Sequence, residues 1–163
     1  LEHQVQIQNM ITRVNYDVRN LLVREFTSVM NDSGISQETN TRITKIIEPL
    51  VKAMFMVGEA EITDSMNGNT NYRNNFEARG PIDSKGRSLR QLDLKSRLFR
   101  YPMSYLVYSS EFNALPALAK DMIFERFNSI LNGNDSSGSY IHLNDSDRIA
   151  IYEILTETHP DFQ

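Results

Sequence analysis

Basic residues are concentrated in one short stretch of the sequence. Residues 79–100 hold seven of the chain's 17 lysines and arginines, namely Arg79, Lys85, Arg87, Arg90, Lys95, Arg97 and Arg100. A guanidinium group binds a carboxylate or phosphate through two parallel hydrogen bonds, so this cluster is suited to an anion or an acidic partner. Neighbouring aromatic side chains could stack on a planar ligand. The predicted anion or planar-ligand patch consists of Arg87, Arg90, Arg97, Arg100, Tyr101 and Tyr105.

The same cations have a structural interpretation, because carboxylates are abundant nearby. The candidate partners are Glu59, Glu61, Asp64, Asp83 and Asp93. Few apolar residues precede Leu89 in this segment, so burial alone cannot anchor it, while its backbone polar groups must still be satisfied. We expect the arginines of the patch to be chiefly structural, bonding carboxylates and backbone carbonyls, and Arg79 and Lys85 to contribute less.

Other residue types with catalytic or metal-binding chemistry do not form recognisable patterns. His3, His142 and His159 lie far apart and lack a ligand spacing, so no metal site is predicted from them. No serine lies in a nucleophile elbow or a Ser-x-x-Lys element. The chain has no cysteine, which excludes disulfides, thiolate catalysis and Cys-ligated metals. We therefore predict no catalytic residue, no metal ligand and no cofactor within the fragment.

Composition places the chain among ordinary globular proteins. Of its 163 residues, 40% are hydrophobic and 23% are charged. The formal net charge of -4 argues against a dedicated nucleic-acid binder, and no apolar run approaches the ~20 residues of a membrane-spanning helix. We expect one helical domain over residues 1–163. Because the chain starts at Leu1, inside an expected helix, we interpret it as the C-terminal fragment of a longer chain.

Apolar residues at spacings of three and four predict the helices that must position these side chains. The expected helices run from 5 to 30, from a cap at Ser36 to Gly58, briefly near 72–78, from Pro116 to before Gly133, and onward from a cap at Asn144. Pro49 should kink or divide the second helix. Residues 59–90 are expected to be irregular. The predicted fold is an all-α helical bundle of about four to five helices with one long irregular insertion.

The apolar face of the last expected helix is predicted from the same spacing. Its inward-packing residues should be Ile149, Ile151, Tyr152, Ile154 and Leu155. The downstream part of the insertion should pack onto the core through Leu92, Leu94, Leu98, Phe99, Tyr101, Tyr105, Leu106 and Tyr108. The insertion is therefore expected to be ordered.

Several short motifs together resemble a known family signature. They are Gly58-Glu59-Ala60, residues 76–81, Gly86-Arg87-Ser88-Leu89-Arg90, Asp93-Leu94, residues 97–102, residues 104–106 and Leu115-Pro116. The chain resembles the C-terminal part of a family of large, often exported bacterial proteins of uncharacterised function. The resemblance implies a periplasmic or otherwise exported protein, and some relatives are associated with c-type cytochromes. This chain has no Cys-x-x-Cys-His haem attachment site and has Met103 where many relatives have Cys.

Three functions remain open from the sequence. The first is a non-enzymatic interaction or assembly module whose partners are upstream domains of the same chain or another protein, without nucleic acid or membrane insertion. The second is a binding or enzymatic domain for an anionic or planar small molecule, with the arginines and tyrosines lining its pocket. The third is part of a haem or redox site that upstream residues complete, with His3 as the contributor from this chain.

Overall fold

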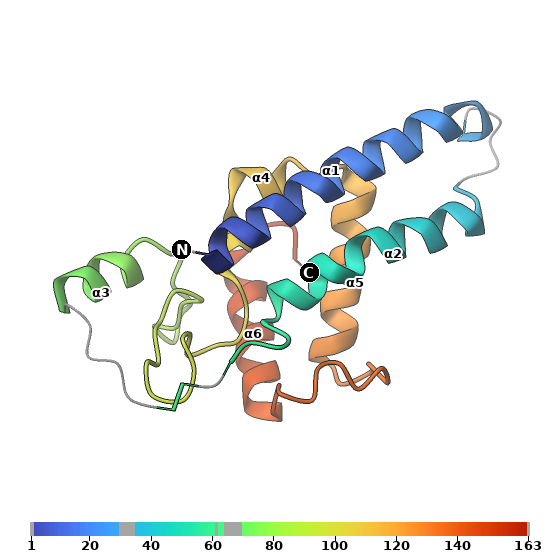
Figure 1. Ribbon diagram of the computed structural model, residues 1–163. Helices are drawn as coiled ribbons and strands as arrows, with labels where there is room; N and C mark the ends of the chain where they lie inside the picture. The colour runs from blue at the N-terminus through green and yellow to red at the C-terminus, as the bar shows by residue number, and fades with distance from the viewer. Residues whose placement is uncertain (1, 30–34, 61, 64–69, 163) are drawn as a thin grey trace. The chain divides into compact units, whose positions relative to one another are not determined.

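The computed structural model describes residues 2–29, 35–60, 62–63 and 70–162, without the side chains of 2–3 and 26–29. These ranges contain six α-helices, one 3-10 helix and no strand, which confirms the all-α prediction (Figure 1). The α-helices are α1 (Glu2–Val29), α2 (Gln37–Met54), α3 (Thr70–Glu77), α4 (Ser110–Asn113), α5 (Ala117–Leu131) and α6 (Asp145–Thr158). The 3-10 helix, η1, covers Tyr105–Tyr108. None of the described helices is both long and apolar enough to cross a membrane.

Contacts group the residues into two compact units, where the sequence predicted one domain. The first unit comprises Leu1–Ala53 and Leu106–Phe127, and the second comprises Met54–Tyr105 and Asn128–Gln163. Neither unit is one continuous stretch, so each has to be described from two segments.

The first unit is built on the antiparallel pair α1 and α2, which run side by side in Figure 1. Apolar residues of both helices are buried between them and the rest of the unit: Ile7, Ile11, Val14, Val18, Ile43, Ile47, Leu50 and Val51. Ser36 caps α2 as predicted, because its hydroxyl accepts a hydrogen bond from the amide of Thr39 at 3.1 Å. The short helix α4 packs against α1.

Helix α2 differs from the prediction in two ways. It continues through Pro49 as one element, so the division, one of the two outcomes expected at this residue, does not occur. Pro49 and Lys45 are both exposed, so water can bond the Lys45 carbonyl that loses its helical donor. The helix also ends at Met54 instead of reaching Gly58, because Met56 takes a left-handed φ of 57° and interrupts the helical backbone.

Helix α6 anchors the second unit and begins at the predicted cap. The side chain of Asn144 accepts a hydrogen bond from the amide of Asp147 at 2.8 Å. Asp147, Ala150, Ile151, Ile154 and Leu155 form its buried stripe. Ile149 was predicted to pack inward but is 59% exposed. Its position belongs to the 149, 153 and 157 row, which lies beside the buried stripe and carries two glutamates.

The irregular insertion is ordered, as expected, and α3 confirms the predicted short helix within it. Residues 91–100 form a tight reversal in which the amide of Asp93 bonds the carbonyl of Leu98 at 3.0 Å, and the amide of Arg100 bonds that of Gln91 at 2.9 Å. Leu92 and Phe99 make one isolated bridge. Leu89, Phe99, Tyr101 and Met103 are buried, so the downstream part of the insertion contributes its own core residues.

Replacing Pro49 with Ala tests how α2 accommodates the proline. The substitution gives residue 49 an N–H group that can donate to the Lys45 carbonyl, which stabilises the helix. Removing proline also makes the unfolded chain more flexible, and this offsets part of the gain in stability. We expect the free energy of unfolding to rise by about 1–2 kcal/mol in urea denaturation. Lys45→Ala, an exchange between two good helix formers on the same helix, should change it by less than about 0.5 kcal/mol. A destabilised Pro49→Ala variant would contradict this account.

Candidate functional site

The basic segment, residues 79–100, is fixed to α6 by two glutamates on one face of that helix. Glu153 and Glu157 are four residues apart, so their side chains point the same way. Glu153 accepts hydrogen bonds from Lys85 Nζ at 2.8 Å and Arg87 Nη2 at 2.6 Å. Glu157 accepts from the amide of Ser84 at 2.7 Å and from its hydroxyl at 3.0 Å. The basic segment is therefore held to α6 through its tip, residues 83–87.

Asp83 organises this tip from inside. Its side chain has 0% exposure, and its Oδ1 accepts the amides of Lys85 at 3.0 Å and Arg87 at 2.7 Å. Its Oδ2 accepts Nε of Arg87 at 2.7 Å. Burial alone would raise the pKa of Asp83, but the amide and guanidinium of Arg87 outweigh burial and lower it. Gly86, with φ of 74°, supplies the left-handed residue that the turn requires.

A second arginine ties the reversal of 91–100 to the start of α6. The two terminal nitrogens of Arg97 donate to the two oxygens of Asp147 at 2.8 and 2.6 Å, the bidentate geometry that suits guanidinium and carboxylate. Hydrogen bonding to Asp147 raises the pKa of Arg97. Nη2 of Arg97 also donates to the carbonyl of Arg100 at 2.6 Å. Arg97 thus satisfies both a carboxylate and a backbone group, as predicted.

Asp93 closes the turn that leads into Arg97. One of its oxygens accepts the hydroxyl of Ser96 at 2.7 Å, the amide of Ser96 at 2.9 Å and the amide of Arg97 at 3.2 Å. The hydroxyl and amide of Ser96 lower the pKa of Asp93 to about 2. The carboxylate is consequently an integral part of the turn.

Arg90 is placed differently from the two paired arginines. Its guanidinium carbon lies 4.0 Å from the ring centre of Tyr105 and 4.9 Å from that of Phe76. Neither Arg90 nor the exposed Arg79 forms an ion pair with a carboxylate of the described residues. Burial lowers the pKa of the Arg90 guanidinium, and the positive charge of Arg79 lowers it as well. Arg90 therefore holds a positive charge on an aromatic support, with no neutralising carboxylate among the described residues.

Gly80 allows the Arg90 side chain to take this path. A Cβ at residue 80 would lie 2.9 Å from Cδ of Arg90 and 2.7 Å from Oγ of Ser88. Both distances are shorter than real Cβ contacts, so any larger residue would displace one of these side chains. The glycine is therefore explained by close approach.

The aromatic residues support the segment and offer little open ring surface. Phe76, Phe99 and Tyr105 form a cluster with ring centres 5.4–6.2 Å apart. Tyr101 and Tyr105 are buried, with 7% and 9% exposure. The exposed Arg100 lies 5.7 Å from the ring centre of Tyr101. These aromatics act as core residues of the second unit.

The predicted patch is thus divided into separate environments. Arg87 and Arg97 pair with carboxylates, Arg90 stacks on Tyr105, and Arg100 extends outward near Tyr101. The expectation of carboxylate or carbonyl partners is wrong for the side chains of Arg90 and Arg100 within the described residues, and Lys85 is engaged more than expected.

The partners of the paired arginines were also only partly predicted. Asp83 serves as expected, whereas Glu61 and Asp64 lie outside the described residues. The sequence did not predict Asp147, Glu153 and Glu157 as partners, and they lie at least 50 positions from the residues that they bond in the segment. The four-residue spacing of Glu153 and Glu157 places both side chains on one face of a helix, and this feature of the sequence could have indicated a shared binding face.

The histidines make structural contacts where they are described. Nε2 of His142 donates to the carbonyl of Phe55 at 2.7 Å. His159 is buried, and its Nδ1 accepts the amide of Asp161 at 3.2 Å. The side chain of His3 lies outside the described residues. No group of three or more His, Asp and Glu side chains within the described ranges is arranged to hold a metal ion.

Comparisons of the chain with protein-family models, with curated proteins and with solved structures found no match. The interpretation of the site therefore rests on the geometry of its own residues.

Alanine substitutions should separate the paired arginines from the exposed one. Arg87→Ala leaves the buried Asp83 without its guanidinium and should lower the free energy of unfolding by about 3 kcal/mol. Arg97→Ala should lower it by about 2 kcal/mol, because a bidentate bond to the buried Asp147 is lost. Arg100→Ala should stay within about 0.5 kcal/mol. Urea denaturation of the three variants measures these differences, and equal losses at all three positions would contradict the assignment.

The pKa of Asp93 provides a second test. A carboxyl whose pKa is lower in the folded than in the unfolded state stabilises the fold above the unfolded value, and this stabilisation is lost as the pH falls through the folded value. Carbon-13 NMR titration of the Asp93 carboxyl should give a pKa of about 2 in the native chain. Ser96→Ala should raise it and make unfolding begin at a higher pH during acid titration. An unchanged pKa in the variant would contradict the role of the hydroxyl.

Proposed function

We propose that the chain is a non-enzymatic interaction or assembly module that receives an acidic group of its partner at Arg90. The partner is another domain of the same protein or a second protein. The observation that carries the proposal is the Arg90 guanidinium, which rests on Tyr105 and Phe76 and has no carboxylate partner among the described residues.

The arrangement around Arg90 reduces the cost of binding an anion. An exposed arginine loses rotamer freedom when it binds, whereas the two rings already restrict Arg90. Its partial burial also strengthens a bond to an incoming carboxylate relative to one formed in bulk water. Arg79 adds positive potential at the same place. These properties favour a charge-assisted hydrogen bond from Arg90 to the partner.

A small anionic molecule is the second candidate, supported by the same guanidinium, which has no carboxylate partner in the described part of the chain. A planar ligand is less well supported, because Arg90 itself covers the Tyr105 ring and Tyr101 is buried, so neither ring is open for stacking. The exported location and the link to haem proteins stay expectations of the family resemblance.

Titration with two anions distinguishes these candidates. A short oligoglutamate peptide represents an acidic protein segment, and inorganic phosphate represents a small anion. Isothermal titration calorimetry at low salt should show binding of the peptide, and Arg90→Gln should weaken it about tenfold or more. Arg79→Gln should cause a smaller loss. Arg100→Gln, an identical charge change at an exposed residue of the same segment, should have little effect.

The outcomes separate specific from general attraction. Equal losses for Arg90→Gln and Arg100→Gln would mean that the peptide responds only to overall charge, and the proposal would be wrong. Phosphate binding that is tighter than peptide binding and depends on Arg90 would favour the small-anion candidate. Thermal unfolding of each variant checks that the second unit remains folded.

A further inference from the structure

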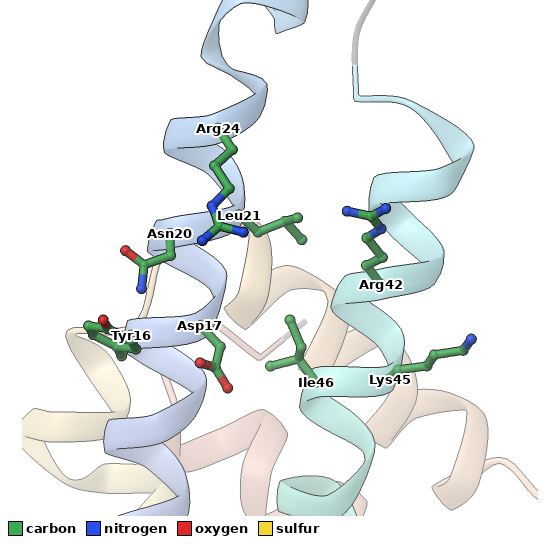
Figure 2. A pocket seen from close by; sticks show the side chains of 8 residues that line it. All are labelled: Tyr16, Asp17, Asn20, Leu21, Arg24, Arg42, Lys45 and Ile46. Carbon is green, nitrogen blue, oxygen red and sulfur yellow. The ribbon is translucent and has the colours of Figure 1, made fainter.

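A groove runs between α1 and α2 in the first unit. Its wider part has a volume of ≈ 490 Å³ and is lined by Tyr16, Asp17, Asn20, Leu21, Arg24, Arg42, Lys45 and Ile46 (Figure 2). An adjoining part of ≈ 320 Å³ shares Asp17, Lys45 and Ile46 and extends to Met10 and Pro49. The two parts form one groove that follows both helices.

The groove has an apolar floor between charged margins. Leu21 and Ile46 point toward each other from the two helices in Figure 2, and Arg24 and Arg42 lie nearby on opposite sides. Arg24 has no ion-pair partner among the described residues, whereas Arg42 pairs only with the largely exposed Glu38. The cations at the margins therefore remain available to an acidic ligand.

We propose that this groove binds an amphipathic helix with an apolar face and acidic flanks. From Met10 to Arg24 the groove spans 15 residues of α1, about 21 Å at the helical rise, which matches a bound helix of similar length. A third helix lying along two antiparallel helices packs its ridges into their groove. The binding helix places apolar side chains over Leu21 and Ile46 and carboxylates beside Arg24 and Arg42.

Tyr16 marks the edge of this surface. It is 67% exposed and lines the wider part of the groove, although an aromatic ring of this size is usually buried. Tyrosine and arginine are among the residue types that contribute most to protein interfaces when a partner buries them. The charge and shape of the groove thus point to a protein helix as the ligand.

The test uses a synthetic peptide of about 14 residues, with leucine at spacings of three and four and glutamate elsewhere. Fluorescence anisotropy with the full chain should show saturable binding that weakens at high salt. The double variant Arg24→Glu/Arg42→Glu should weaken binding about tenfold or more. Tyr16→Ala, at an exposed position that leaves the fold intact, should weaken it about threefold or more. Lys52→Glu, the same type of charge reversal on α2 outside the groove lining, should stay within about twofold.

Control peptides define the result that would overturn the proposal. A scrambled peptide of the same composition has no apolar face and should bind at least about tenfold more weakly. Equal binding of both peptides, a loss in Lys52→Glu as large as in Arg24→Glu/Arg42→Glu, or no saturable binding of the amphipathic peptide would each reject the groove. Arg90→Gln should leave the interaction unchanged, so this result is independent of the anion-binding proposal.

Discussion

A buried carboxylate, Asp83, determines how the insertion of the second unit is held. A carboxylate without solvent contact is costly unless hydrogen bonds and a positive charge compensate it. Two backbone amides of its own turn and the guanidinium of Arg87 provide that compensation. Because the same guanidinium reaches Glu153 on α6, a local turn is also a long-range anchor. Ionic bonds thus replace the apolar contacts that a segment of this composition lacks near its tip.

Neighbouring cations of the basic segment have different kinds of partner. Arg87 and Arg97 are held by carboxylates, so their charges are neutralised within the unit. Arg90 lies three residues after Arg87 but meets aromatic rings instead of a carboxylate. The close approach of Gly80 to Cδ of Arg90 limits the path of this side chain.

Local patterns in the sequence predicted the helices better than the site. Asn144 and Ser36 cap the helices as expected because capping requires only contacts within four residues. Ile149 was misplaced because periodicity does not show which side of the apolar row faces the core. The pairing of arginines with α6 depends on contacts across at least 50 residues, which residue spacing cannot reveal. Each of the two compact units combines separated segments, an arrangement that local sequence patterns do not reveal.

The two proposed surfaces have one physical feature in common. The chain carries 21 acidic and 17 basic residues, so most cations can find an internal carboxylate. Arg24 and Arg90 nevertheless lie beside apolar or aromatic groups without a carboxylate partner among the described residues. Such a guanidinium has no ion pair within the described residues, so the Coulomb energy of an ion pair is gained only when an anion arrives. Repeated use of this arrangement in two separate units favours acidic protein partners, which an overall acidic surface would otherwise repel.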